Sequence, residues 1–133
     1  MLIRNFIITF VVFFCIDLVW LGIVAKNLYS KMIGYIMSPK PNWYAAIVFY
    51  VIFIIGLMFF ALYPALEKDK VIYALLYGMF FGFVTYSTYD LTNLATLKDW
   101  PILITVIDLA WGTFLGGATT TLSYLAIKFL ETR

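Results

Sequence analysis

Residues 71–129 decide the fold of this chain. They read VIYALLYGMFFGFVTYSTYDLTNLAT over residues 71–96 and PILITVIDLAWGTFLGGATTTLSYLAIKF over residues 101–129, with four residues between them. Each stretch is mostly apolar and longer than the roughly 20 residues that an α-helix needs to cross a bilayer. The connection is so short that the second helix must return beside the first, and Pro101 suits a helix start. The two stretches therefore predict an antiparallel helical hairpin that spans a membrane.

Two further apolar stretches precede this hairpin, at residues 3–25 and 44–63. The chain has 133 residues, of which 65% are hydrophobic and 12% charged, an imbalance outside the usual range for a soluble domain. We therefore predict an all-α membrane protein with a single transmembrane domain, residues 1–133. Its fold is a bundle of four transmembrane helices, and its main partner is the lipid bilayer.

The connections carry most of the remaining charge. Residues 26–43 connect the first two spans, and we expect a short interfacial helix there, ended by Pro39 and Pro41. Residues 64–70 are charged and are expected to be exposed. Four spans place both termini on one side, which holds five lysines and arginines against four on the other. Because these residues favour the cytoplasm in short loops, we expect a multi-pass protein with cytoplasmic termini.

Several classes of site are excluded by the composition. The sequence has no histidine, which excludes imidazole catalysis, haem ligation by histidine and the common zinc sites. Cys15 is the only cysteine, so it can form neither an internal disulfide nor a thiolate cluster. The net charge of +2 is small and unclustered, so nucleic acid is not an expected partner. No metal site is predicted, and the residues indicate no particular cofactor.

Three aspartates, Asp17, Asp90 and Asp108, lie inside the apolar stretches. An aspartate costs roughly 2.5 to 3.5 kcal/mol at the centre of a membrane helix. No lysine or arginine lies in the interior of a span, so protons, neutral hydrogen-bonding groups, water or a cation must stabilise these acids. Each lies roughly 12 to 14 Å along its helix from the same membrane face. We therefore predict that the three form one layer and face the interior of the bundle.

Polar and aromatic residues accompany this layer. Tyr86, Asp90 and Asn93 share one helical face, with Tyr89 beside them. Residues 16–20, IDLVW, are echoed by residues 107–111, IDLAW, and the two spans run antiparallel, as in the inverted repeats that surround membrane binding sites. The predicted ligand-binding or ion-binding residues are Asp17, Trp20, Tyr86, Tyr89, Asp90, Asn93, Asp108 and Trp111. No catalytic residue is assigned. A structural polar network that fixes helix register is the alternative interpretation.

Two GxxxG patterns lie in the hairpin. Gly78 and Gly82 belong to the first stretch, and Gly112 and Gly116 to the second. Such patterns allow helix backbones to approach closely. They favour packing of the two hairpin helices against each other, and a homodimer face is the alternative.

Three segments resemble the signature of a family of small bacterial four-span membrane proteins of unknown function. They are TYDLTNLATLKDWP at residues 88–101, DLAWGT at residues 108–113 and DLVWLG at residues 17–22. The resemblance covers nearly the whole chain. It implies a bacterial inner-membrane location and a loose link to lipid modification, and it implies no particular activity.

Three functions are compatible with these residues. The favoured one is a small transport or ligand-binding protein whose carboxylates take up a proton or cation. The second is a lipid-modifying enzyme or its accessory subunit, in which paired carboxylates act as acid and base or hold a hard cation. The third is a structural partner of another membrane protein. The ligand of the site would accordingly be a small molecule, a lipid or a cation.

Overall fold

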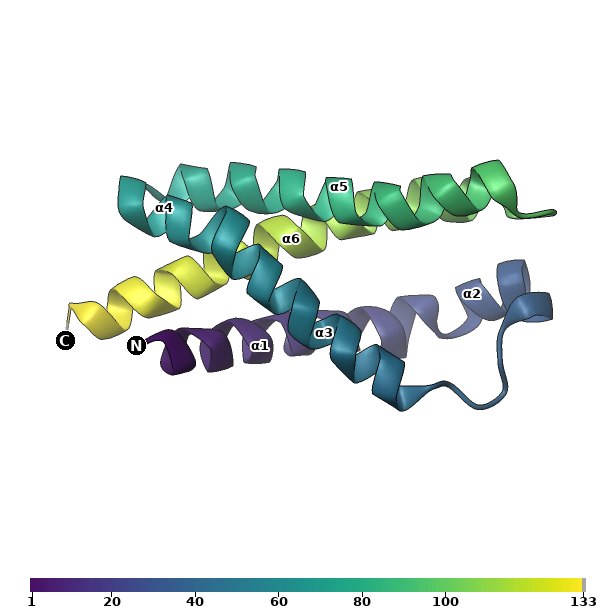
Figure 1. Cartoon of the computed structure of the whole chain (residues 1–133), viewed down its shortest axis with the longest axis horizontal. Coiled ribbons are helices and arrows are strands. Elements are labelled where there is room, and N and C mark those ends of the chain that lie inside the picture. The colour runs from purple at the N-terminus through teal and green to yellow at the C-terminus, as the bar shows by residue number, and fades with distance from the viewer. Residues whose placement is uncertain (133) are drawn as a thin grey trace.

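The computed structural model describes residues 1–132, most of which are helical (Figure 1). The helices join into four rods, each long and apolar enough to cross a membrane: Leu2–Ile36, Trp43–Lys68, Val71–Thr96 and Ile102–Glu131. The two termini lie at the same end of the molecule, as an even number of spans requires (Figure 1). The prediction of an all-α protein with four membrane-spanning helices is confirmed.

The first rod is longer than predicted and changes its helical pitch on the way. It contains α1 (Leu2–Val19), the π-helical segment η1 (Trp20–Val24), α2 (Ala25–Ile33) and the 3-10 turn η2 (Gly34–Ile36). At the end of η1 the amide of Ala25 donates to the carbonyl of Trp20, five residues back, so this turn is wider than an α-helical one. The short helix predicted after the first span is α2, which continues α1 without a break. Its interfacial position stays a prediction.

The second rod also contains a π-helical segment. It is built from α3 (Trp43–Leu57), η3 (Met58–Leu62) and α4 (Tyr63–Lys68). The side chain of Asn42 caps α3 by accepting the amide N–H of Ala45 at 3.1 Å. The rod runs past its predicted end at residue 63, because Pro64 lies at the start of α4, where a residue without an N–H is tolerated. Of the connection predicted to be exposed, the charged residues 67–70 are exposed, whereas residues 64–66 belong to α4 and are buried or partly buried, so the prediction is wrong for them.

The third and fourth rods, α5 (Val71–Thr96) and α6 (Ile102–Glu131), form the predicted hairpin. Their backbones touch where glycines face each other. A Cβ atom on Gly82 would lie 1.9 Å from the carbonyl oxygen of Gly112, and one on Gly116 would lie 2.2 Å from that of Gly78. The predicted close approach at both GxxxG patterns is confirmed. These glycine faces are therefore occupied within the chain, and a homodimer would need another surface.

Aromatic residues fix α3 against the rest of the bundle. Phe53 packs against Phe13 of α1 on one side and Phe81 of α5 on the other, with ring centroids 5.2 and 5.3 Å apart. Tyr50, one turn earlier on α3, also contacts Phe13, at 5.7 Å. In Figure 1, α3 crosses α1 obliquely. This crossing brings the first turns of α3 toward the acidic layer.

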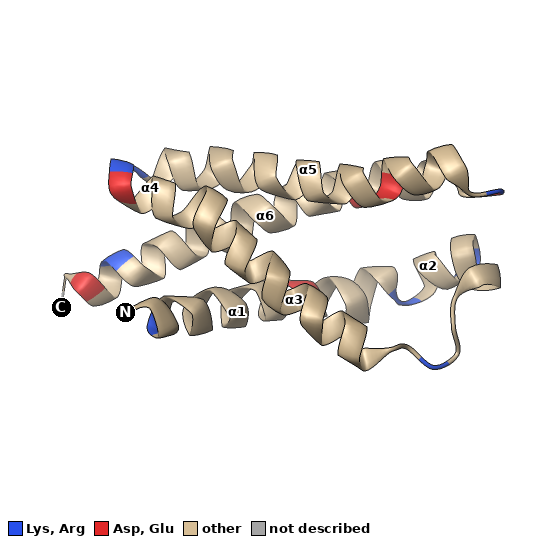
Figure 2. Cartoon of the chain, viewed as in Figure 1, with Lys and Arg blue, Asp and Glu red and all other residues tan. Residues whose placement is uncertain are grey.

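The surface of the rods is suited to lipid. Large apolar side chains such as Ile52, Phe80 and Leu103 are exposed along them. Most lysines, arginines and acidic residues lie toward the ends of the rods and in the connections (Figure 2). The acids in the middle of the rods are the three aspartates predicted to form a layer, and all three are buried. The expected interior orientation of these aspartates is therefore confirmed.

The glycine contact leads to a first prediction. Gly82→Ala must push α5 away from α6, because the added Cβ meets backbone that cannot rotate away. We expect a loss of roughly 1 to 3 kcal/mol in unfolding free energy. Gly34→Ala is the matched control, since nothing lies within 4 Å of its Cβ position. Thermal unfolding in detergent should show a lower midpoint for the first variant alone, and equal midpoints would contradict the packing described above.

An ion pair on the terminal side leads to a second prediction. Lys128 of α6 pairs with Asp69 in the α4–α5 turn, and its ammonium, through a hydrogen bond and charge attraction, holds the pKa of the Asp69 carboxyl below its usual value. Because the folded pKa is the lower one, the stabilisation is present above the unfolded pKa of about 3.9 and is lost as pH falls through the folded pKa.

Asp69→Asn should therefore lower the unfolding temperature slightly at pH 7 and have no effect at strongly acidic pH. Asparagine tolerates the left-handed backbone at this position, where φ is 56°, so the variant removes only the charge. The measurement is the difference in unfolding midpoint between the variant and the wild type at the two pH values. A difference that does not change with pH would show that the ion pair contributes nothing.

Candidate functional site

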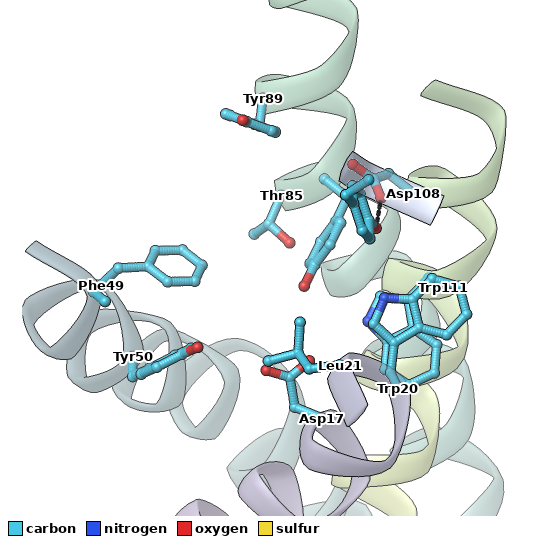
Figure 3. Close-up of a pocket in the computed structure, with 12 residues that line it drawn as sticks. Asp17, Trp20, Leu21, Phe49, Tyr50, Thr85, Tyr89, Asp108 and Trp111 are labelled. Atoms are coloured by element: carbon cyan, nitrogen blue, oxygen red, sulfur yellow. Dashed lines mark hydrogen bonds between the residues drawn. The ribbon is translucent and has the colours of Figure 1, made fainter. Parts of the chain in front are cut away.

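A pocket of about 510 Å³ lies where all four rods meet (Figure 3). Its lining residues are Asp17, Trp20, Leu21, Tyr29, Ala46, Phe49, Tyr50, Thr85, Tyr86, Tyr89, Asp108 and Trp111. Six of the eight predicted site residues are among them, and the other two, Asp90 and Asn93, are not. The pocket reaches the surface, because Leu21, Phe49 and Tyr89 are exposed.

Asp17 and Asp108 lie on separate walls of this pocket. Asp17 comes from α1 and Asp108 from α6, and their side chains are 8% and 5% exposed. In Figure 3 they face the pocket from two sides, with tyrosine and tryptophan side chains around them. The indole N–H of Trp111 interacts with the Asp17 carboxyl. No lysine or arginine within residues 1–132 lines the pocket, so its acids are stabilised by neutral donors.

Tyr29 supplies the donor for Asp108. Its hydroxyl, on α2, donates to the Asp108 carboxylate. In an uninterrupted α-helix Tyr29 would be rotated about 120° away from the face that carries Asp17, twelve residues earlier. The wider turn of η1 brings it back to within about 30° of that face. The α-helical periodicity of the sequence therefore did not predict that Tyr29 lines the site. The hydropathy pattern gives no sign that the η1 turn contains an extra residue.

The two echoed segments meet at the pocket. Trp20 and Trp111 stack face to face, with ring centroids 4.3 Å apart and planes inclined by 10°. The aspartate that precedes each tryptophan lines the same pocket. This pairing is the arrangement expected of an inverted repeat, and common ancestry of the two halves stays a hypothesis.

Asp90 lies behind the pocket wall and is fully buried. Neither of its carboxyl oxygens has a hydrogen-bond donor among the described residues. The neighbouring ionisable group is Asp108, whose carboxyl interacts with that of Asp90. Two ionised carboxylates repel each other and only accept hydrogen bonds, so a hydrogen bond between them would need a proton on one of them. Asp90 and Asp108 thus form a carboxyl pair with Asp17 across the pocket, as the predicted layer implied.

The remaining predicted residues lie around this pair. Tyr86 lines the pocket and packs its ring on Gly112, where a Cβ would lie 2.3 Å from the ring. Tyr89 is an exposed lining residue whose ring meets Trp100 edge to face at 5.9 Å. Asn93 does not line the pocket and interacts with Tyr89 one turn away. Its role is therefore indirect.

The contribution of α3 to the pocket was not predicted from the sequence. Phe49 and Tyr50 form one wall of the pocket (Figure 3). The second span has no ionisable side chain in its apolar interior except the phenol of Tyr50, so nothing distinguished that residue from the aromatic residues around it. The helix crossing, which the sequence did not predict, places Tyr50 near Asp17.

Comparison with known protein families identifies the chain. The family model described as predicted membrane protein (DUF2177) matches residues 2–125. The chain belongs to that family. The resemblance noted from the sequence is thereby confirmed at the level of the family. No curated protein and no solved structure matches this DUF2177 chain.

Only a few kinds of polar group line the pocket of this DUF2177 protein. Carboxyls, phenols, two indoles and one threonine hydroxyl provide its polarity. The Thr85 hydroxyl is engaged with the carbonyls of Phe81 and Gly82, at 2.9 and 3.1 Å, and has no base to activate it. Among residues 1–132, no group of three or more histidine, cysteine, aspartate or glutamate side chains is arranged to hold a metal ion. The arrangement can exchange protons and attract a positively charged group.

Tyr29 provides the third prediction. Tyr29→Phe removes the hydroxyl that donates to Asp108, and leaves a buried carboxylate without this donor. We expect a loss of roughly 1 to 3 kcal/mol in unfolding free energy. Tyr44→Phe, at an exposed tyrosine outside the pocket, is the control. Chemical unfolding in detergent measures both, and equal stability of the two variants would show that the Tyr29 hydroxyl does not stabilise Asp108.

Proposed function

We propose that this protein is a small transport or ligand-binding protein of the bacterial inner membrane, and that its intramembrane carboxyls take up a proton or a cation. The observation that carries the proposal is the buried Asp90–Asp108 pair beside an open pocket that has a third acid and no base. Buried acids of this kind are costly and usually functional. The pocket gives them contact with a ligand, which a sealed structural network would not need.

Charge balance supports uptake of a positive species. Three ionised aspartates within one low-dielectric layer would repel each other and would lose most of their hydration. A proton on the Asp90–Asp108 pair, or a cation in the pocket, removes that repulsion. The two events compete, because a bound cation favours ionised carboxyls and therefore releases protons. Such competition is a common basis for coupling proton movement to ligand movement.

The pocket chemistry gives less support to catalysis. Its threonine is hydrogen-bonded to backbone carbonyls, and its acids face neutral donors. A lipid-modifying activity would need a nucleophile or a group that clamps phosphate, and neither is found among the lining residues. Binding is therefore the function that these residues serve best.

We also infer that the termini lie in the cytoplasm. The end of the molecule with both termini carries Arg4, Lys68, Lys70 and Lys128, and the sequence adds Arg133. The opposite end carries one basic residue fewer, and lysine and arginine accumulate on the cytoplasmic side of short loops. The pocket lies toward the opposite end, because Asp108, one of its acids, follows Trp100 of the α5–α6 turn by about eight residues.

The fourth prediction tests proton uptake. Infrared spectroscopy of the purified protein in lipid nanodiscs, at neutral pH without metal salts, should show a protonated carboxyl. Asp90→Asn and Asp108→Asn should each abolish that signal, because each removes one member of the pair. Asp99→Asn is the control, since Asp99 is an exposed acid in the α5–α6 turn. If all carboxyls of the wild type are ionised under these conditions, the proton-sharing pair is wrong.

A further inference from the structure

We propose that the pocket binds an organic cation with an apolar body, such as an alkylammonium or arylammonium compound. This inference rests on the proposed ligand-binding function and specifies the class of ligand. Three features of the pocket carry it: the separation of its acids, its aromatic walls and its size.

The acids are arranged for an extended ligand and not for a small ion. Asp17 and Asp108 occupy separate walls, and within residues 1–132 no group of three or more acidic, histidine or cysteine side chains could hold a metal ion. A bare metal ion prefers several oxygen ligands around one centre, which this arrangement does not offer. An organic cation can place its charged group against one carboxylate and fill the remaining space with its apolar part.

Aromatic residues form most of the pocket walls. Seven of the twelve lining residues are tyrosine, tryptophan or phenylalanine, from α2, α3, α5, α6 and η1. Aromatic faces attract ammonium groups through their quadrupole, and the attraction is strongest where water is excluded. The same rings pack well against an apolar body. Aromatic side chains next to buried carboxylates therefore match both parts of such a ligand.

The volume and the charge narrow the ligand class further. About 510 Å³ is in the range of pockets for small organic molecules and far exceeds the space that a proton needs. None of the described lining residues is a lysine or arginine, which disfavours fatty acids, phosphate esters and other anions. Exposed lining residues Leu21 and Phe49 lie on rods whose surfaces are apolar, so a lipophilic cation could enter from the bilayer.

Tetraphenylphosphonium is a suitable probe, because it is an aromatic cation and tetraphenylborate is an anion of nearly the same size and shape. Equilibrium dialysis of the purified protein in nanodiscs should show saturable binding of the cation and none of the anion. Asp17→Asn and Asp108→Asn should each weaken binding roughly 10- to 100-fold. The control Asp99→Asn should bind as the wild type does. Circular dichroism and gel filtration establish that each variant is folded.

A second pair of variants separates aromatic recognition from simple charge attraction. Trp20→Leu should weaken binding roughly 2- to 30-fold, and Trp20→Phe should restore most of the loss, since it restores an aromatic face. Equal affinities of these two variants and the wild type would overturn the aromatic part of the proposal. Equal binding of tetraphenylphosphonium and tetraphenylborate would overturn the cationic part.

The binding experiment and the infrared experiment test different proposals, so either can fail without the other. A protonated carboxyl pair without saturable binding of tetraphenylphosphonium would leave proton uptake standing and overturn the organic cation. A protein that shows neither a protonated carboxyl nor saturable binding of tetraphenylphosphonium would overturn both proposals.

Nanodiscs with and without phosphatidylethanolamine distinguish two sources of the ammonium group. If this lipid displaces the probe, the ligand is a lipid headgroup amine; if a free alkylammonium compound displaces the probe and the lipid does not, the ligand is a free amphipathic amine. Displacement by neither would overturn recognition of an organic ammonium.

Discussion

The backbone contact between α5 and α6 is the constraint on which the rest of the structure depends. At Gly82 and Gly112 the two helices come so close that no side chain fits between them. The contact fixes the depth of Asp90 relative to Asp108, and it leaves a space above Gly112 that the Tyr86 ring occupies. The carboxyl pair and one wall of the pocket therefore both follow from the absence of a Cβ atom at these positions.

The acids in turn impose requirements on the other rods. A buried carboxyl needs donors or protons, and the hairpin itself supplies no donor to Asp90. The first rod meets part of this need, since Tyr29 reaches Asp108. It also brings Asp17, whose carboxyl adds negative charge to the site and so increases the need for donors or protons. A structure selected for stability alone would place apolar side chains at these positions, so stability does not explain the buried acids.

The sequence predicted the spans, the hairpin and the acidic layer, because these depend on distance along regular helices. Counting residues from the α5–α6 turn was enough to place Asp90 beside Asp108. The sequence did not predict Tyr29, because a π-helical turn changes the angular position of every later residue and leaves no mark on hydropathy. Nor did it predict Tyr50 and Phe49, because the crossing of α3 over α1 is decided by the packing of Phe13, Phe53 and Phe81, residues that look alike in an apolar span.

The π-helical turn at Trp20–Val24 makes the hydrogen bonding of a single helical turn decide where Tyr29 lies relative to Asp108. Deleting one residue there would restore ordinary α-helical hydrogen bonds and would be tolerated by the helix itself. Tyr29 would then follow Asp17 by eleven residues and lie about 20° from the same face, so its hydroxyl would stay near Asp108. The same turn relaxed to an α-helix without a deletion would instead rotate α2 by roughly 90° relative to α1 and carry the hydroxyl away. The first helix can therefore change its hydrogen bonding in this turn without losing its ability to span the bilayer, while the carboxylate on α6 loses its donor. In a membrane protein this small, a shift between π-helical and α-helical hydrogen bonding in one turn is thus a way to alter the site without any change of sequence.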